Sequence, residues 1–442
     1  MNTPELLAPA GTPEHLETAF AYGADAVYAG QPRYSLRVRN NSFKDVAALG
    51  SGIARAHELG KQFYLVSNIA PHNNKVRSYL KDLEPVLKHK PDALILSDPG
   101  LIMLVREKWP DQPIHLSVQA NAVNWATVEF WRRQGISRVI LSRELALDEI
   151  REIRDRVPDM ELEVFVHGAL CMAYSGRCLL SGYMNHRDAN QGACTNACRW
   201  NYKEVRHSHD QTGDLITTCS DSGGVQDVEP KEILLEEPNR PGGFIPAYED
   251  EHGTYIMNSK DLRAVQHVAE LAKMGVHSLK IEGRTKSTYY VARTTQVYRR
   301  AIDEAVHGKP FDMNLMDELE ALSNRGYTEG FLRRHVPREY QSYEQGSSFL
   351  GTQQVVGTIT DTDDQWLTID VKNKFAPGDQ LELINPAGNI RFSASIMENR
   401  NGQTMDYAPG SGHIVRIPKP ADLPQTLEHS YLTKILPSAH SN

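Results

Sequence analysis

The sequence predicts an α/β protein: a (β/α) barrel, regular or distorted, with a long cysteine-bearing loop after its seventh strand, followed by a small C-terminal antiparallel β-barrel. Short apolar runs alternate with amphipathic segments through residues 5–308, which is typical of repeated βα units and a parallel sheet. Eight such units favour a closed barrel over an open doubly wound sheet. From about residue 349 the pattern changes to short alternating strands separated by turn signals such as Asn385-Pro386-Ala387-Gly388.

The elements of the barrel follow from this alternation. The predicted strands are residues 5–9, 26–30, 62–67, 93–97, 114–118, 138–142, 162–167 and 278–282. The predicted helices are residues 13–22, 43–59, 74–89, 100–108, 125–134, 146–156, 260–274 and 289–307. Capping signals agree with these bounds, because Thr12-Pro13 opens the first helix and Gly135, Gly275 and Gly308 follow three helix ends.

The chain divides into four parts. Residues 1–310 form the barrel, with an insertion at 168–259, and residues 311–346 form a helical segment (313–322) and a linker. Residues 347–420 form the β-barrel from the strands QVVGTIT, WLTIDV, DQLELI, IRFSAS and HIVRIP. We expect residues 421–442 to be a loosely held tail.

Polar residues at the strand ends are the first candidates for a site. In (β/α) barrels the active site lies at the C-terminal ends of the strands, so the residues that leave each strand matter most. Capping of the following helix is the alternative role for the Asn and Asp residues among them. The candidates are Arg33, Asn68, Asp98, Gln119, Asn121, Arg143, Glu144, His167, Glu282 and Arg284.

The connection after the seventh strand is far longer than the others. It spans residues 168–259, whereas two to six residues are usual in such units, and loops of this length are functional or disordered. Its later part, residues 201–251, is polar and rich in Gly, Pro, Asp and Glu. We expect that part to be a lid or excursion with little regular structure.

Four cysteines of this loop have the spacing of a metal site. Cys171, Cys178, Cys194 and Cys198 form a C-x6-C-x15-C-x3-C arrangement. Zinc sites usually combine two tight pairs, whereas the long first gap suits a larger cuboidal cluster. The spacing therefore favours a [4Fe–4S] cluster over zinc, with unligated thiols as the third alternative. The fifth cysteine, Cys219, is interpreted as a bystander.

Charge and hydropathy narrow the class of protein. The formal net charge of −8 gives no global nucleic-acid signature, so a polyanion needs a local basic face. Residues 284–300 and 325–338 are two such stretches, and ordinary solvated helix faces are the alternative. No run approaches the roughly 18 apolar residues of a membrane span and the N-terminus lacks a basic start, so we predict a cytoplasmic protein without a membrane partner.

Several enzyme motifs are incomplete in this sequence. Gly50-Ser51-Gly52 lacks the third glycine of a dinucleotide fingerprint, and His57-Glu58 lacks the second histidine of a zinc protease. The sequence contains neither a P-loop nor a G-x-S-x-G nucleophile elbow. A serine or metallopeptidase mechanism is therefore not predicted.

Distinct segments carry a family resemblance. PELLAPAGTPEHLETAFAYGADAVYAGQPRYSLRVRNNSF, SVQANAVNWATVEFW, ILSRELALDEI, FVHGALCMAYSGRCLLSG, CTNACRW and LKIEGRTKS closely resemble the collagenase-like peptidase family of unassigned mechanism. Within it, the similarity is to bacterial prephenate-dependent tRNA hydroxylases that make 5-hydroxyuridine at the wobble position. The resemblance implies hydroxylation of the tRNA anticodon loop through prephenate instead of molecular oxygen, and a [4Fe–4S] cluster on the four cysteines. An electron donor is a further partner that this reading leaves open.

The resemblance and the strand ends together give a hypothetical site. Prephenate carries two carboxylates, which call for cations, so the substrate-binding candidates are Arg33, Arg37, Asn68, Gln119, Arg143, Arg284 and Lys286. The catalytic candidates are His167, Glu144, Glu282 and Asn121. A splayed wobble base could stack on Tyr28, Tyr174 or Trp200. RNA phosphates could meet Lys286, Arg293, Arg325, Arg333, Arg334 or the β-barrel.

Two other functions stay open from the sequence. A collagenase-like peptidase is the first, and it needs a nucleophile or an activated water that the sequence does not show. An RNA-binding or assembly protein with a structural cluster is the second. Chemical change of bound tRNA separates the second alternative from a hydroxylase.

Overall fold

The computed structural model describes ten segments of the chain, and no helix among them is long and apolar enough to cross a membrane. These segments are residues 3–36, 42–170, 207–209, 215–217, 231–236, 244–250, 253–255, 260–324, 326–333 and 352–436.

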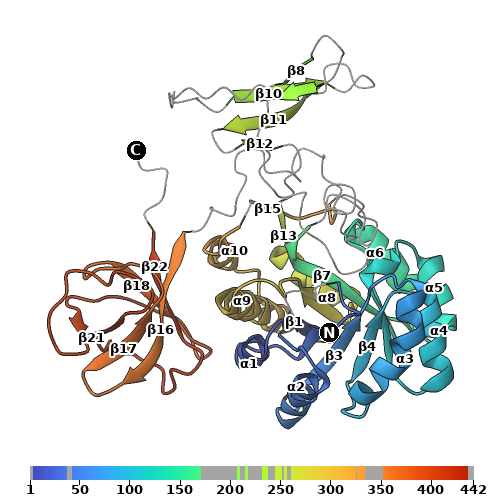
Figure 1. The fold of residues 1–442 in the computed structure, drawn as a ribbon, viewed down its shortest axis with the longest axis horizontal. Helices are drawn as coiled ribbons and strands as arrows, with labels where there is room; N and C mark the ends of the chain where they lie inside the picture. The colour runs from blue at the N-terminus through green and yellow to red at the C-terminus, as the bar shows by residue number, and fades with distance from the viewer. Residues whose placement is uncertain are drawn as a thin grey trace.

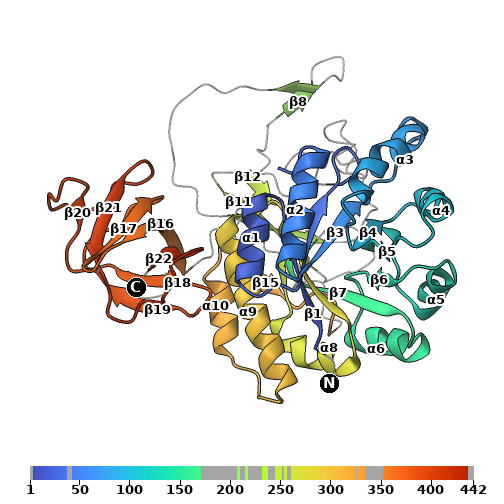
Figure 2. The same ribbon diagram turned by 90° about the horizontal axis from the view of Figure 1, so that it is seen from below.

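Eight parallel strands close into a barrel, which confirms the predicted fold class (Figures 1 and 2). Each strand pairs with the next, and β14 pairs with both β1 and β7 to complete the ring. The first three strands have the predicted bounds, whereas the next three end one or two residues earlier. The strands are β1 (Glu5–Pro9), β2 (Ala26–Gly30), β3 (Gln62–Ser67), β4 (Ala93–Leu96), β5 (Ile114–Leu116), β6 (Arg138–Ile140), β7 (Glu161–Ala169) and β14 (Ser278–Ile281).

Helices surround the barrel on its outer side (Figure 2). Side chains cap several of them at the end of the barrel where the strands finish; for example, the Asp98 carboxylate accepts from the Leu101 amide at 2.9 Å. Asp98 therefore caps helix α4, which is the alternative role that the sequence analysis gave for Asp and Asn residues at the strand ends. The helices are α1 (Pro13–Ala21), α2 (Val46–Glu58), α3 (Asn73–Leu87), α4 (Pro99–Lys108), α5 (Trp125–Arg133), α6 (Leu147–Arg156), α8 (Val268–Met274) and α9 (Thr288–Val306).

The helix predicted for residues 260–274 was wrong over its first part. Asp261–Arg263 is the strand β13, which pairs antiparallel with β7, and α8 begins only at Val268. β7 runs past the end of β14 to Ala169, so the backbone groups of its last residues need another partner. β13 supplies that partner, and β15 (Tyr327–Thr328), which follows α10 (Asn314–Glu320), extends the sheet in parallel to β13.

The insertion contains more regular structure than its composition suggested. β8 (His207–His209) and β9 (Leu215–Thr217) pair with each other, and β10 (Lys231–Glu236), β11 (Phe244–Asp250) and β12 (Gly253–Tyr255) form an antiparallel sheet. Apolar residues such as those of Ile233-Leu234-Leu235 favour strands, while the Gly, Pro and Asp residues between them favour turns.

The C-terminal domain is a curled antiparallel sheet, a half-barrel, as the alternating strands predicted. The expected tail at residues 421–442 was wrong for Tyr431–Ile435, which is the strand β22 between β16 and β18. Its side chains Leu432 and Thr433 are fully buried, so packing and pairing on both sides hold it. The other strands are β16 (Gln353–Thr362), β17 (Trp366–Val371), β18 (Gln380–Ile384), β19 (Ile390–Ser393), β20 (Glu398–Asn399) and β21 (Ile414–Pro418).

The interior of the barrel contains a buried network of charges. Arg138 donates to Glu5 at 2.7 Å and to Glu163 at 3.4 Å, and Lys280 donates to Glu163 at 2.7 Å. Arg138 also donates to the partly exposed Glu161 at 2.8 Å, and the more deeply buried groups are two cations, Arg138 and Lys280, and two carboxylates, Glu5 and Glu163. We call these four residues the charge quartet. Because β1, β6, β7 and β14 contribute one residue each, the quartet joins the strands that close the ring.

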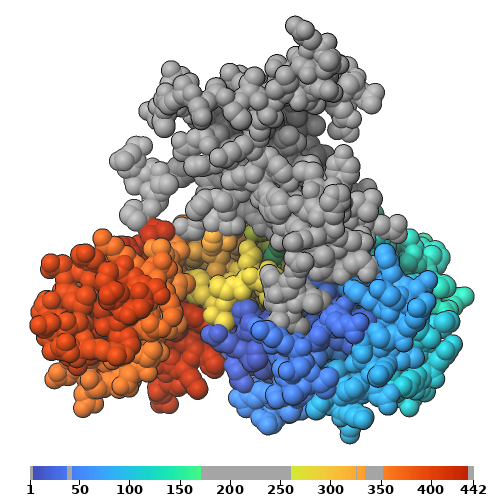
Figure 3. All heavy atoms as spheres, viewed as in Figure 1, coloured from blue at the N-terminus to red at the C-terminus, as the bar shows by residue number. Residues whose placement is uncertain are grey.

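The half-barrel docks on the side of the barrel that carries α1 and α9 (Figures 1 and 3). The Tyr22 hydroxyl of α1 donates to the His429 carbonyl at 2.9 Å, and the Gln296 amide of α9 donates to the Asn385 carbonyl at 3.0 Å. Arg293 is 1% exposed, 3.3 Å from Glu318 and 3.8 Å from Glu382 of the half-barrel. The prediction that Arg293 meets RNA phosphates was therefore wrong.

Removal of the Arg293 side chain should destabilise the protein strongly. Arg293→Ala leaves the Glu318 and Glu382 carboxylates without their buried cation, which costs about 3 to 5 kcal/mol. Arg133→Ala, which breaks an exposed pair with Glu129 on α5, should cost less than about 1 kcal/mol. Unfolding in guanidinium chloride measures the free energy of unfolding of both variants. Equal losses of stability would contradict the conclusion that Arg293 stabilises the contact between the barrel and the half-barrel.

Candidate active site

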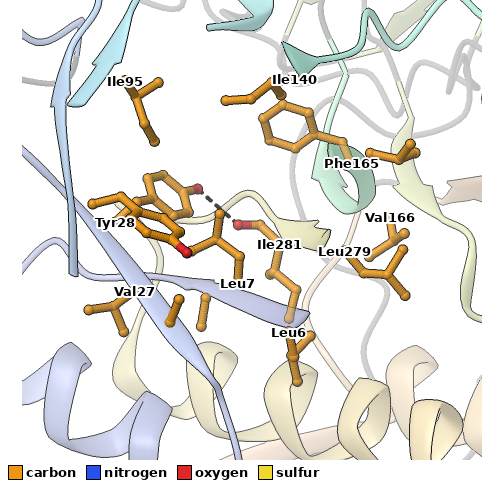
Figure 4. Packing of buried hydrophobic residues seen from close by; sticks show 14 of the residues in the cluster. Leu6, Leu7, Val27, Tyr28, Ile95, Ile140, Phe165, Val166, Leu279 and Ile281 are labelled. Carbon is orange, nitrogen blue, oxygen red and sulfur yellow. Dashed lines mark hydrogen bonds between the residues drawn. The ribbon is translucent and has the colours of Figure 1, made fainter. Parts of the chain in front are cut away.

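Two aromatic side chains lie inside the barrel near its C-terminal end. Tyr28 of β2 and Phe165 of β7 point into the interior beside Ile95 and Ile140, whereas Leu6 and Val27 point to the helices (Figure 4). The Lys280 ammonium of the charge quartet lies 4.3 Å from the centroid of the Tyr28 ring and 5.3 Å from that of Phe165. A cation therefore packs against both rings and contributes positive potential to this part of the barrel.

The Tyr28 hydroxyl is committed to the end of β14. It lies 2.8 Å from the Ile281 carbonyl, the dashed contact in Figure 4, and 3.0 Å from Glu282 Oε2. Burial, with the nearby Glu282 charge, raises the pKa of Tyr28 well above its usual value, so the phenol stays protonated and donates. Tyr28 is 2% exposed, and the prediction that a base stacks on it was wrong.

Glu282 is held from three directions. Besides the Tyr28 contact, its amide donates to the His167 carbonyl at 2.9 Å, and its own carbonyl accepts from the Tyr290 hydroxyl at 2.8 Å. Of these contacts, the one from Tyr28 involves the carboxylate, while the other two hold the backbone that carries it, so the side chain is positioned to accept a hydrogen bond or a proton at the mouth. Glu282 thus lies at the mouth with its side chain held, and its catalytic role stays a prediction.

Two arginines lie above the aromatic rings. The Arg143 guanidinium lies 4.0 Å from the centroid of the Phe165 ring and donates to the Ala169 carbonyl at 2.7 Å, without an ion pair among the described residues. Arg284 lies 5.4 Å from the Tyr28 centroid and donates to Ser35 Oγ at 2.9 Å. Guanidinium groups braced by carbonyl, hydroxyl and aromatic partners suit a small carboxylate. We call Tyr28, Arg143, Phe165, Glu282 and Arg284 the mouth cluster.

The polar amides beside the mouth mainly hold loops together. Asn68 follows β3 and is 7% exposed; its side chain accepts from the Leu36 amide at 3.3 Å and donates to Ser117 Oγ at 3.2 Å. Gln119 lies in the 3-10 turn Val118–Ala120, and Asn121 ends that turn with φ of 51°. Asparagine tolerates this left-handed conformation better than most residues, which explains the residue type.

The hydrogen bonds and ion pairs of Arg33 and Glu144 are made with residues outside the mouth cluster. Arg33 has φ of 69°, is largely exposed and pairs with Asp82 of α3 at 2.7 Å. The Glu144 carboxylate accepts a hydrogen bond from the Ser142 hydroxyl two residues earlier. The structure therefore brings together Arg143, Glu282 and Arg284 of the predicted set, and places Arg33 on the outer rim.

His167 faces away from the barrel interior. A register shift between Lys280 and Ile281 makes Val166 an extra residue of β7, so His167 pairs with Ile281 and lies on the outer face. There it packs against Tyr290 and Tyr298 of α9 and Tyr327 of β15, with centroid distances of 5.4 to 5.8 Å. We call these three rings the tyrosine cage.

The hydrogen bonds around His167 define its tautomer. The Tyr298 hydroxyl donates to the Val166 carbonyl at 2.6 Å and accepts from the Ala264 amide, so at 3.3 Å it accepts from Nδ1 of His167. Nε2 is buried without a partner in the part of the chain that the structure describes. Burial, with the charges of Lys286 and Arg263, lowers the pKa of His167 to about 3. At neutral pH the imidazole of His167 is therefore uncharged: Nδ1 carries the proton and Nε2 can accept a hydrogen bond.

Lys286 belongs to the outer group with His167. Its ammonium lies 5.3 Å from the centroid of Tyr290 and 4.0 Å from the Asp261 carboxylate. His167 and Lys286 thus form a second polar group outside the ring, separate from the mouth cluster inside it. Tyr290 contacts both, because its ring packs on His167 and its hydroxyl binds the Glu282 carbonyl.

Several predicted residues lie outside the described segments. These are Arg37, Tyr174, Trp200, Arg325, Arg334 and the cysteines 171, 178, 194, 198 and 219. Among the described residues no group of three or more His, Cys, Asp or Glu side chains is arranged to hold a metal ion. The described end of β7 nevertheless fixes where the cysteine loop begins, since Ala169 precedes Cys171 by two residues.

Sequence reasoning missed Glu163, Lys280 and the serines that brace the site. Glu163 and Lys280 stand inside the apolar runs LEVFV and SLKIE, where charged residues are buried only when paired. That signal could have identified them as partners. Nothing in the local sequence marks Ser35 and Ser117, because their roles depend on contacts with distant loops.

The fold and the site together define a class: a (β/α)8-barrel protein with a cation-lined mouth, an insertion after the seventh strand and a C-terminal half-barrel. The chain belongs to peptidase family U32, whose sequence profile matches residues 11–342. The profile of the peptidase family U32 C-terminal domain matches residues 351–432, which is the half-barrel.

Close relatives of known name extend over almost the whole chain. The chain is 61% identical over 433 residues to tRNA hydroxylation protein P of Escherichia coli (strain K12), covering 96% of this chain and 95% of that protein. It is 60% identical to the protein of the same name from Haemophilus influenzae, covering 95% and 94%. A solved structure, the U32 peptidase Mk0906, is 15% identical with a TM-score of 0.34, covering 39% of this chain and 72% of that one.

The buried neutral state of His167 should make stability depend on pH. Its pKa is about 3 when folded and about 6.5 when unfolded, so the unfolded chain binds the extra proton. The contribution is complete above pH 6.5 and falls as pH drops, reaching a loss of about 2 kcal/mol at pH 5. Urea unfolding at pH 7.5 and pH 5 should show a difference about 2 kcal/mol smaller for His167→Gln than for the wild type.

Tyr298→Phe is the control for this measurement. It removes the hydrogen bond to Nδ1 but keeps the burial that is the main cause of the lowered pKa, so it should retain the wild-type pH dependence. A His167→Gln variant with the unchanged wild-type slope would refute a buried, neutral His167.

Proposed function

We propose that the protein hydroxylates the wobble uridine of tRNA to 5-hydroxyuridine, with prephenate as the source of the hydroxyl group and without molecular oxygen. Identity of 61% and 60% with proteins named for tRNA hydroxylation, across nearly the full length, is the observation that carries the tRNA part. The substrate of the proposal is therefore the anticodon loop.

A [4Fe–4S] cluster on Cys171, Cys178, Cys194 and Cys198 is the second part of the proposal. Their spacing and the family resemblance support it. The mouth cluster contacts the start of this loop, because Arg143 donates to the Ala169 carbonyl. Such a cluster supplies one-electron transfer, and an electron donor is then a further partner.

Prephenate is the third part, and the charges of the mouth support it. Its two carboxylates need cations, and Arg143 and Arg284 each lie over an aromatic ring at the same end of the barrel. Glu282, held by Tyr28, is placed to accept a proton there. The peptidase alternative needs a nucleophile beside a base, and no such pair is seen among the five described residues of the mouth cluster.

Loss of one cluster ligand should abolish the modification. A bacterial strain without 5-oxygenated wobble uridine, grown under limited oxygen, should regain 5-hydroxyuridine with the wild-type gene and not with Cys178→Ala, as measured by mass spectrometry of its tRNA. Cys219→Ala is the matched control and should restore it, because this cysteine lies outside the four-residue arrangement. Restoration by Cys178→Ala, or stoichiometric zinc without iron and sulfide in anaerobically prepared protein, would refute the cluster.

Arg143→Ala should weaken prephenate binding selectively. A charge-assisted hydrogen bond contributes about 1.5 to 3 kcal/mol, so the KM for prephenate should rise roughly 10- to 150-fold while the KM for tRNA stays unchanged. Arg143→Lys should recover only part of the loss, because an ammonium lacks the guanidinium fork. Arg133→Ala, an exposed change on α5, is the control. An unchanged KM for prephenate in Arg143→Ala would exclude Arg143 from that site.

A further inference from the structure

Among the arginines on the described helices, Arg77 alone has a side chain that makes no ion pair or hydrogen bond with the described residues. The others bind carboxylates or backbone carbonyls: Arg55 pairs with Glu17, for instance, and Arg106 donates to the Pro110 carbonyl. The partnered arginines are Arg55, Arg106, Arg132, Arg133, Arg151, Arg154, Arg156, Arg293, Arg299 and Arg300.

The rest of α3 explains why Arg77 has no counter-charge. The helix buries Tyr79, Leu83 and Val86, and Arg77 and Lys81 lie on the opposite face, one turn apart. Its two acidic residues are engaged elsewhere. Asp82 accepts from Arg33 at 2.7 Å and from the Tyr34 hydroxyl at 2.6 Å, and Glu84 accepts from Lys108 of α4 at 2.6 Å.

These cations lie at the end of the barrel that carries the mouth. α3 begins at Asn73, six residues after the C-terminal end of β3, so Arg77 lies in its second turn and Lys81 near its middle. Lys75 lies in the first turn, where its ammonium donates to the Arg33 carbonyl at 3.3 Å. Arg33 is paired with Asp82, whereas Arg77 and Lys81 have no ion pair among the described residues, in a chain whose net charge is −8.

We infer that Arg77 and Lys81, flanked by Lys75 and Arg33, form a docking surface for the sugar-phosphate backbone of RNA beside the mouth. This inference rests on the proposed function and adds the face on which the RNA lies. Cations without counter-ions are what a phosphate backbone recruits, and contacts of this kind position RNA without reading its sequence.

The same surface lacks what other partners of a basic face require. Membrane-binding helices and protein interfaces add large apolar side chains to their cations. The large exposed apolar residues of the described segments are Leu59, Met103, Trp125, Phe130, Met313, Phe331, Ile396 and Tyr407, and none lies on α3. A lipid surface and an apolar protein groove are therefore disfavoured relative to RNA.

The double variant Arg77→Ala/Lys81→Ala tests the surface in the full-length protein. Binding of an unmodified tRNA transcript, followed by fluorescence anisotropy at several salt concentrations, should weaken roughly tenfold. The slope of log K against log salt should fall in magnitude by about 1.5, since each lost phosphate contact removes roughly 0.7 to 0.9. Thermal unfolding should be unchanged, because neither side chain has an ion pair or hydrogen bond to lose within the described segments.

Lys88→Ala/Lys309→Ala is the matched control. Both lysines are exposed, and each follows the C-terminal end of its helix, α3 or α9, at the opposite end of the barrel. This double variant removes the same charge and should keep the wild-type affinity and slope. An equal loss in the control would show that net charge alone governs binding, which would overturn the inference.

The remaining outcomes separate the inference from the proposed function. An α3 variant with wild-type affinity and slope would overturn the docking surface, while formation of 5-hydroxyuridine by the wild type would leave the proposed function standing. If polyglutamate of matched charge displaced tRNA as well as RNA does, the surface would be assigned to acidic proteins, and the inference of an RNA docking surface would be overturned. A wild-type protein that fails to bind tRNA would contradict both.

Discussion

The barrel depends on a balanced set of charges in its interior. Barrel interiors are usually filled by branched apolar side chains, whereas here Glu5, Arg138, Glu163 and Lys280 occupy part of that volume. A charge buried alone costs several kcal/mol, so each member of the quartet is tolerated only while the other three hold their positions. Since the four residues come from β1, β6, β7 and β14, this requirement fixes the relative register of the strands that close the ring.

One irregularity of β7 separates two kinds of chemistry. Up to Phe165, every second side chain of β7 points into the barrel, and Phe165 contacts Lys280 and Arg143 there. Beyond the shift at Val166, His167 turns outward into the tyrosine cage and Gly168 adopts φ of 108°, with a Cβ there only 2.5 Å from the Glu282 carbonyl. Only glycine permits this close approach. The start of the cysteine loop and the position of Glu282 therefore depend on the same few residues.

The sequence was sufficient for the elements with strong periodicity and insufficient where distant contacts decide. The bounds of β1, β2 and β3 and the cap at Asp98 follow from local patterns. The strands β13 and β22 do not follow from local patterns. Each forms by pairing with strands that are far away in the chain: β13 with β7, and β22 with β16 and β18. The same holds for the candidate site. The strand-end rule predicted Arg143, Glu282 and Arg284, which the structure brings together at one end of the barrel, whereas the outward turn of His167 required a bulge that no periodicity reveals.

Local pairing, not net charge, determines where an acidic protein can meet a polyanion. A charge pair closer than 4 Å presents little field beyond the Debye length of about 8 Å at physiological ionic strength. The cations of α5 and α6, such as Arg133 and Arg156, are neutralised in this way. Arg77 and Lys81 on α3 and Arg143 at the mouth have no such partner among the described residues, so their charges stay available to an anion. An RNA drawn to α3 would then present its loop to a mouth whose own cations remain for a smaller anion.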